Sequence, residues 1–408
     1  KGMEVYGHEY AMHFPWHRWP AAPDRKLSAL HDRLKAAGAQ MGDYNGWERA
    51  NWFARPGDDT SEEATQTWDR AGPWEPRIRE ECEAVRDGCG VIAISGFTRL
   101  AVEGPGARTH VDGLTASRLP QPGRIGLAYF GDARGRILTE MSVIPRSDDE
   151  MWLITAGAAQ WHDRDVLAQG LPDGVTITDR SDRYDCLLVT GPAARDILGP
   201  LTDGDLSLPW LSVQDASVCG VGCVLIRVSF AGELGWEIHC PAADAPAIWD
   251  AVTQGGAKPF GMWALNSLRI EKGYRAWKGD LSTDYSLLEG GLERFVRLDK
   301  PQAFPGKAAL LAEKQAGVSK RFAPLIVEAG AADAPYMSTI WHEGEIVGET
   351  TSGAWGYRVG ASVALAMLRA DLAVPGTDLE VEIYGERCPA TVQPDAPLWD
   401  PQNERLRA

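Results

Sequence analysis

The pattern of apolar segments changes near residue 320, and this change constrains the fold more than any other feature of the chain. Between about 76 and 315, strand-like segments such as Glu150–Thr155 and Cys186–Thr190 alternate with helix-like segments. From about 320 to the end, short strands recur between Gly and Pro turns. The alternating pattern predicts an α+β body. The evenly spaced short strands predict a small β-barrel or sandwich.

The length of the chain supports a division into domains. Single hydrophobic cores stop growing at roughly 250–300 residues, and this chain has 408. The polar segment 56–74 is typical of a linker or long loop. We therefore expect a multi-domain α+β chain with these parts: an N-terminal extension and linker at 1–75, a body at 76–318 and a C-terminal β-barrel domain at 319–408.

The charge and cysteine content exclude several classes of protein. The chain has 41 basic and 57 acidic residues, and a net charge of −16 argues against a nucleic-acid surface. The seven cysteines show no disulfide pattern, and Cys219 and Cys223 have no matching second pair for a zinc site.

The sequence has neither the roughly 20-residue apolar run of a membrane helix nor the apolar core of a signal peptide in its first residues. We expect a cytoplasmic protein with reduced thiols, no metal and no membrane partner.

Five segments carry candidate functional residues. The sharpest is Ser229-Phe-Ala-Gly-Glu-Leu-Gly-Trp-Glu-Ile, in which a Gly-containing turn with Glu233 separates two strands. A turn Glu of this kind is usually just solvated. The other segments are a hairpin at 131–143, a locally basic helix end at 264–277, and the runs Gly46-Trp-Glu-Arg-Ala-Asn-Trp-Phe and Gly348-Glu-Thr-Thr-Ser-Gly-Ala-Trp-Gly-Tyr.

Together, and in their order along the chain, the five segments resemble the tetrahydrofolate-binding enzymes of the glycine-cleavage T-protein (aminomethyltransferase) superfamily. The likeness is strongest to the folate-binding C-terminal half of dimethylglycine and sarcosine dehydrogenases. The resemblance implies a T-protein-like fold with a central cavity that the C-terminal barrel closes on one side. It also implies tetrahydrofolate as the cofactor and a small-molecule one-carbon donor as the partner.

The resemblance implies roles for individual residues in holding the cofactor. Glu233 matches the Glu that holds the pterin, where a carboxylate accepts both the ring N–H and the exocyclic amine. Phe230 replaces the usual Tyr and keeps the aromatic ring. Tyr129 and Trp277 are further cofactor-binding candidates. Arg269 either meets the glutamate tail of folate or pairs with an acidic residue of the chain.

Glu140 is the candidate catalytic residue. It matches an acidic position near the folate N5 and N10 atoms, where many members of the family have Asp. A carboxylate there can stabilise a cationic iminium or position an attacking amine. The alternative is an ordinary solvent-facing Glu on a strand. Ala276 stands where the dehydrogenase branch usually has His, which removes one proton carrier.

The flavin half of those dehydrogenases has no counterpart in this sequence. The segment nearest to a G-x-G-x-x-G turn, Gly220-Val-Gly-Cys-Val-Leu, lacks the third Gly and the following helix. We therefore do not expect the chain to bind FAD in the usual way.

Three functions remain open. The first is a self-contained demethylase or demethylenase that moves a methyl or methylene group to tetrahydrofolate, with an aromatic ether as a candidate donor. The second is a folate-binding subunit or fragment of a flavin-dependent amine dehydrogenase, which forms 5,10-methylenetetrahydrofolate with a flavoprotein partner. The third, a folate-binding protein without catalysis, fits the carboxylate of Glu140 least well. The changed His and Tyr positions and the 16 Trp residues favour the first.

Overall fold

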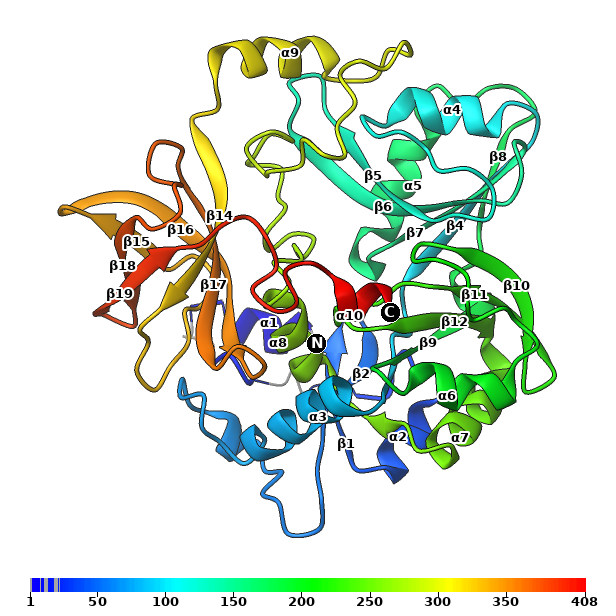
Figure 1. Cartoon of the computed structure of the whole chain (residues 1–408), viewed down its shortest axis with the longest axis horizontal. Coiled ribbons are helices and arrows are strands. Elements are labelled where there is room, and N and C mark those ends of the chain that lie inside the picture. The colour runs from blue at the N-terminus through cyan, green and yellow to red at the C-terminus, as the bar shows by residue number, and fades with distance from the viewer. Residues whose placement is uncertain (1, 8, 11–13, 18–20, 22) are drawn as a thin grey trace.

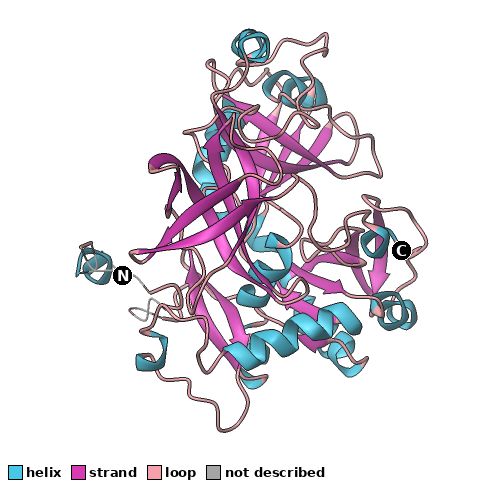
Figure 2. Cartoon of the chain, turned by 60° about the vertical axis from the view of Figure 1, so that its left-hand side comes forward, coloured by secondary structure: helices cyan, strands magenta, loops and turns pink. Residues whose placement is uncertain are grey.

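The computed structural model describes residues 2–7, 9–10, 14–17, 21 and 23–408. The remaining residues fall in the expected N-terminal extension and lie outside the described part: 1, 8, 11–13, 18–20 and 22. Figure 1 shows three sheet structures arranged around the segments that carry α8 and α10. Helix α1 (Gly2–Gly7) stands off at one side of the molecule in Figure 2. No helix in the described part of the chain has both the length and the apolar character needed to span a bilayer.

The first structure is a six-stranded sheet with the order β10-β11-β12-β9-β3-β13. Only the short β13 runs parallel to its neighbour β3. The bounds of its strands are β3 Gly90–Ala93, β9 Tyr184–Thr190, β10 Val213–Val218, β11 Val221–Ile226, β12 Gly235–Pro241 and β13 Lys258–Pro259.

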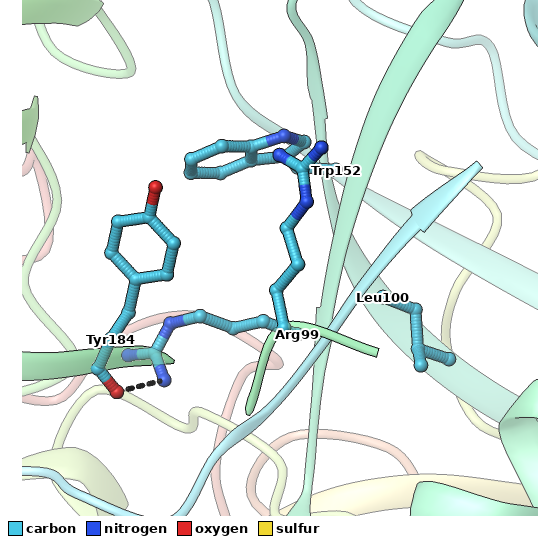
Figure 3. A pocket seen from close by; sticks show the side chains of 5 residues that line it. Arg99, Leu100, Trp152 and Tyr184 are labelled. Atoms are coloured by element: carbon cyan, nitrogen blue, oxygen red, sulfur yellow. Dashed lines mark hydrogen bonds between the residues drawn. The ribbon is translucent and has the colours of Figure 1, made fainter. Parts of the chain in front are cut away.

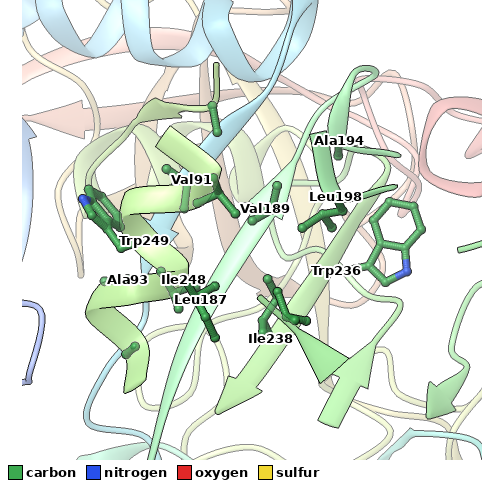
Figure 4. Close-up of a cluster of buried hydrophobic side chains, with 14 of the residues drawn as sticks. Val91, Ala93, Leu187, Val189, Ala194, Leu198, Trp236, Ile238, Ile248 and Trp249 are labelled. Carbon is green, nitrogen blue, oxygen red and sulfur yellow. The ribbon is translucent and has the colours of Figure 1, made fainter. Parts of the chain in front are cut away.

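Helices α6 (Ala194–Leu198) and α7 (Ala245–Gln254) cover one face of this sheet. Figure 4 shows side chains of β9 and β12, such as Val189 and Ile238, pointing into one cluster with side chains of these helices. Helix α2 (His31–Ala36) and the hairpin of β1 (Ala39–Tyr44) and β2 (Trp47–Phe53) bury apolar residues in the same cluster. The segment around 30–54 therefore packs as part of the body.

The second structure is a five-stranded sheet with the order β5-β6-β7-β4-β8. Helices α4 (Ala107–Leu114) and α5 (Gln160–Ala168) bury their apolar residues against one face of it. The opposite face meets the six-stranded sheet in an apolar seam that includes Ile154 and Ile226. The bounds of the strands are β4 Thr98–Glu103, β5 Gly126–Gly131, β6 Ile137–Pro145, β7 Glu150–Thr155 and β8 Thr176–Asp179.

The third structure is a closed barrel with the order β14-β17-β16-β15-β18-β19. It confirms the barrel that the recurring short strands predicted, and closure leaves no unpaired sheet edge. The bounds of its strands are β14 Lys320–Val327, β15 Thr339–His342, β16 Glu345–Gly356, β17 Ala361–Arg369, β18 Asp378–Ile383 and β19 Glu386–Val392. The remaining helices are α3 Glu75–Asp87, α8 Met262–Ile270, α9 Lys307–Ala316 and α10 Glu404–Arg407.

A buried arginine fastens the barrel to the body. Arg358, in the turn between β16 and β17, donates to the carboxylates of Glu271 and Glu233, the latter over 2.8 Å. Its remaining contacts are the carbonyl oxygens of Ala231 and Leu268, at 3.0 and 2.6 Å. All three charged side chains are at most 1% exposed. Because buried charges are tolerated only when they are paired and hydrogen-bonded, this cluster fixes how the two parts dock.

The segment after the barrel returns to the same cluster. Trp399 donates its indole N–H to Glu233 over 2.8 Å, and Arg405 donates its Nε–H to the other carboxylate oxygen over 2.7 Å. Lys272 donates to the carbonyl oxygens of Trp399 and Asp400 at 3.0 and 3.1 Å. We call residues 395–407 the C-terminal arm; it crosses the centre of the molecule, in red in Figure 1.

Replacing Arg358 tests whether this junction holds the structure together. Arg358→Met leaves the buried carboxylate of Glu271 without its cation and leaves Glu233 with Arg405 alone, and we expect it to lower the free energy of unfolding by about 3–5 kcal/mol. The measurement is urea denaturation followed by Trp fluorescence. Arg369→Met is the matched control, because Arg369 is 44% exposed and pairs with exposed acids; it should change stability by less than about 0.5 kcal/mol. Equal losses for the two variants would contradict the role of the junction.

Candidate functional site

The inner faces of the two sheets hold the candidate site. On β6, Met141 and Val143 point into the core beneath α4 and α5. Because successive strand residues point to opposite faces, Glu140 lies on the other face, with Ile144, which packs in the apolar seam between the sheets. Glu140 therefore belongs to the surface that the five-stranded sheet turns towards the six-stranded sheet.

Glu140 is partly exposed and lies beside a buried phenol. It is directly across the ladder from Tyr129 on β5, whose side chain is 2% exposed and packs against Phe295 at 5.1 Å between ring centroids. Burial raises the pKa of Glu140, while the Tyr129 hydroxyl and the positive charge of Arg275 oppose that rise. Burial, with the nearby Glu140 charge, raises the pKa of Tyr129 well above its ordinary value. A carboxyl group with a raised pKa keeps its proton to a higher pH than a solvated one and can therefore serve as a proton donor.

Aromatic side chains near the ends of the motif segments are candidates for contact with a flat ligand. Phe230 is 40% exposed although it is large and apolar, and it stacks on Tyr274 with 5.7 Å between ring centroids. The indole N–H of Trp277 is buried and has no hydrogen-bond partner within the described residues. A buried donor without a partner is costly, so this group suits a ligand acceptor. Phe230 and Trp277 therefore stay candidates for contact with a ligand, whereas Tyr129 is covered by the chain.

Glu233 is enclosed by the chain. Its side chain is 1% exposed, and its oxygens accept the bonds from Arg358, Trp399 and Arg405. The sequence predicted a ligand contact here. In this structure, a ligand would reach the carboxylate only if Arg405 or Trp399 moved away. The motif does not reveal this, because each partner lies more than 100 residues further along the chain.

Arg269 is likewise committed to internal contacts. It donates to Asn266, the Tyr274 carbonyl oxygen, Asp280 and Ser352, and these bonds use every N–H donor of its guanidinium. The acidic partner is Asp280, which is fully buried. Of the two roles expected for Arg269, the geometry matches the ion pair with an acidic residue of the chain, and no donor is left for the tail of a folate.

Glu237, in the same motif as Glu233, is the carboxylate that the sequence analysis missed. Its neighbours Trp236 and Ile238 point into the core beneath α6 and α7, so Glu237 and His239 point to the opposite face of β12. Glu237 is directly across the ladder from Ile226 of the apolar seam. Its side chain is 19% exposed. The alternation of apolar residues along this strand was the signal that could have identified it.

The face with Glu237 contacts the five-stranded sheet directly. His239 Nε2 lies 3.0 Å from Glu237 Oε2, which accepts its hydrogen bond, and His239 Nδ1 accepts from Arg99 Nε on β4 over 3.3 Å. No other hydrogen bond within the described residues engages the Glu237 carboxylate. Glu140 and Glu237 are therefore two partly exposed carboxylates on the facing surfaces of two sheets.

Arg99 also lines a small pocket next to this face. The pocket is bounded by Arg99, Leu100, Trp152, Arg180 and Tyr184. Figure 3 shows Arg99 beside Tyr184, with its bond to the Tyr184 carbonyl oxygen dashed. The guanidinium groups of Arg146 and Arg180 lie over the Trp152 ring at 5.1 and 5.4 Å. This pocket shares no residue with the motif segments.

Two family models match this chain. The GCVT N-terminal domain matches residues 30–300, and the glycine cleavage T-protein C-terminal barrel domain matches residues 320–400. The crystal structure of the glycine cleavage system aminomethyltransferase T from Bartonella henselae superposes with a TM-score of 0.76 at 21% identity. That match covers 91% of this chain and 97% of the other.

The curated relatives of this chain include dehydrogenases and aminomethyltransferases. The mitochondrial dimethylglycine dehydrogenase of Mus musculus is 33% identical over all of this chain and 48% of its own length. The aminomethyltransferase of Listeria monocytogenes serotype 4a is 29% identical over 90% of this chain and 96% of its own length. The chain thus spans about half the length of the dehydrogenase relatives and nearly the full length of the aminomethyltransferases. With both family models matched over most of its residues, the chain belongs to the glycine cleavage T-protein family.

Proposed function

We propose that this chain transfers a one-carbon unit from a small donor to tetrahydrofolate, and that an aromatic methyl or methylenedioxy ether is the donor class. The observation that carries the proposal is the pair of partly exposed carboxylates, Glu140 and Glu237, on the facing surfaces of the two sheets. Family membership supports the folate, because aminomethyltransferases are relatives along nearly their full length.

The side chains around the site fit a folate. Phe230 offers an exposed aromatic ring, stacked on Tyr274, for a flat ligand, and Trp277 offers a buried N–H that needs an acceptor. Glu237 offers a carboxylate for the two neighbouring donors of a pterin edge. We therefore assign the pterin edge to Glu237 and give Glu233 the structural role of holding Arg358 and the C-terminal arm.

Glu140 is proposed as the group that moves the proton. Tetrahydrofolate, when bound, supplies the nucleophilic amine that receives the carbon. Breaking a carbon–oxygen bond of the donor leaves a phenolate oxygen that needs a proton, and a carboxyl group with a raised pKa holds one to donate. The ionised Glu140 then takes the proton released as the new carbon–nitrogen bond forms. No oxidant is required, because the carbon keeps its oxidation level.

A second function is favoured by one observation. The chain matches dimethylglycine dehydrogenase over its whole length but covers only about half of that relative. On this reading the chain captures a one-carbon unit that a flavoprotein has oxidised, and Glu140 holds the cationic iminium. The same residues serve both functions, so identifying the one-carbon donor distinguishes one function from the other.

The cofactor assignment predicts opposite results for the two glutamates of one motif. Glu237→Gln replaces one acceptor oxygen by an amide that cannot accept, and the lost charge-assisted bond is worth roughly 1.5–3 kcal/mol. We expect the Kd for tetrahydrofolate, measured by anaerobic calorimetry, to rise about tenfold to a hundredfold with the melting temperature unchanged.

Glu233→Gln is the matched comparison for that titration. It should lower the melting temperature, because Arg358 and Arg405 lose a buried carboxylate, and it should change the Kd of the folded protein by less than about threefold. A different result would assign the contact with the pterin edge to Glu233. In that result, Glu233→Gln binds tetrahydrofolate more weakly at an unchanged melting temperature, and Glu237→Gln binds it as the parent does.

The donor assignment predicts turnover without an added flavoprotein. The chain is incubated anaerobically with tetrahydrofolate and one donor at a time. The donors are an aromatic methyl ether, a methylenedioxy arene, formaldehyde, and dimethylglycine together with a flavin dehydrogenase. Mass spectrometry measures the methyl- and methylene-tetrahydrofolate that form. We expect an ether to be consumed and Glu140→Gln to lose a factor of about 10²–10⁴ in rate while still binding tetrahydrofolate. The rate should also fall as pH rises through the raised pKa of Glu140, because the acid form is then lost.

The control for this assay is Glu345→Gln, an exposed carboxylate on the barrel that should turn over at the parental rate. Product only from formaldehyde or from the dehydrogenase mixture would establish the second function in place of the first. Parental turnover by Glu140→Gln with every donor would remove its catalytic role.

A further inference from the structure

A chain of three side chains connects the two sheets behind Glu237. Arg99 on β4 is 3% exposed and His239 on β12 is 2% exposed, so both are shielded from solvent. Arg99 Nε donates to His239 Nδ1 over 3.3 Å, and Arg99 Nη2 lies at the same distance from that atom. His239 Nε2 is 3.0 Å from Glu237 Oε2. Glu237 is the only member of the three that is partly exposed.

The chemistry of arginine fixes the proton on the imidazole. A guanidinium group can only donate hydrogen bonds, so His239 Nδ1 must be the acceptor and carries no proton. In the neutral ring the proton is then on Nε2, which donates it to the Glu237 carboxylate. Arg99 cannot turn away from this arrangement, because its Nη1 also donates to the carbonyl oxygens of Phe97 and Tyr184, at 3.3 and 3.2 Å.

Burial and the charge of Arg99 favour the neutral form of the His239 ring. Burial is the largest influence and lowers the pKa of His239, and Arg99 lowers it further. Glu237 and Asp185 act in the opposite direction. Asp185, on the neighbouring strand β9, is itself 3% exposed and accepts a bond from Ser95.

The same geometry disfavours a metal ion as the occupant of this cluster. Cys186, Glu237 and His239 place potential ligand atoms within 4.8 Å of one another. A metal ion would have to bind His239 Nε2, since Nδ1 faces Arg99. The ring would then have no proton on either nitrogen, and burial has raised the pKa of the Cys186 thiol, which disfavours the thiolate that a metal needs.

We propose that Arg99 and His239 are positioning residues for Glu237. Arg99 fixes the His239 ring, and His239 Nε2 donates to Glu237 Oε2, which orients the carboxylate towards the edge of the pterin. This inference rests on the proposed function, which assigns Glu237 to the cofactor. Because the second oxygen of Glu237 accepts no hydrogen bond from any residue that the structure describes, the ligand meets a free carboxylate oxygen whose orientation is already set. Pre-orientation of this kind strengthens binding by removing the cost of ordering the side chain.

The first test determines which ring nitrogen of His239 carries the proton in the unaltered protein. Nitrogen-15 NMR of the deuterated chain with labelled histidine reports whether each imidazole nitrogen carries a proton, and His239→Gln identifies the His239 signals. We expect a neutral ring at pH 7 with the proton on Nε2 and none on Nδ1. A proton on Nδ1 at pH 7, in either the neutral or the charged ring, would overturn the proposal.

The second test separates positioning from a merely structural role. A Gln side chain accepts a bond from Arg99 with its oxygen and donates to Glu237 with its amide, whereas Met does neither. We expect His239→Gln to bind tetrahydrofolate within about threefold of the parent and His239→Met to raise the Kd about tenfold. His342→Gln on the exposed surface of the barrel is the control. Affinities are compared only below the melting temperature of each variant.

The outcomes distinguish this inference from the function on which it rests. Parental affinity in a folded His239→Met would overturn the positioning role while leaving the cofactor assignment intact. Equal loss in His239→Gln and His239→Met would also overturn it, because the hydrogen bonds that Gln restores would then be irrelevant. If the parent protein binds no tetrahydrofolate, the proposed function fails, and the positioning of Glu237 towards that cofactor fails with it even if the NMR result is as expected.

Discussion

The contact between Arg358 and two buried glutamates, Glu233 and Glu271, is the interaction on which the rest of this structure depends. It joins a turn of the barrel to the motif turn and the helix end of the body. An unpaired charge in such a place would be strongly destabilising, so the three side chains hold one another in a single arrangement. The C-terminal arm adds Trp399 and Arg405 to the same carboxylate, which closes the cluster from the outside.

The candidate site takes its shape from this rigid frame. The apolar seam between the sheets fixes the distance between the surfaces that carry Glu140 and Glu237. Arg99 and His239 add a polar bridge across the same seam. Both carboxylates sit on strands, and sites on regular elements are held more closely than sites on loops. The exposed ring of Phe230, which would otherwise be unfavourable in water, lies where a flat ligand can cover it.

Local patterns predicted much of this fold. Segments such as Glu150–Thr155 and Cys186–Thr190 are strands because their apolar residues and flanking turns determine that locally. The barrel followed from evenly spaced short strands, although its closure depends on the pairing of β14 with β19, which no local pattern contains. The ordered motif segments identified the family.

The site was predictable only where its geometry is local. Glu140 was recognised from a motif, and alternation along β6 places it on the inner face. Alternation around Trp236 and Ile238 would have selected Glu237 in the same way, but the motif drew attention to Glu233. The environments of Glu233 and Arg269 depend on Arg405 and Ser352, which are distant in sequence, so one chain without its structure could not reveal that both are already paired.

An experimental structure of the chain with bound 5-formyltetrahydrofolate would show which glutamate holds the pterin. We expect density for the pterin between the inner faces of the two sheets, with its donor edge on Glu237, its reactive nitrogens towards Glu140, and the Arg358 cluster unchanged. A ligand bound to Glu233 with the C-terminal arm displaced, or a ligand bound away from both sheets, would contradict it.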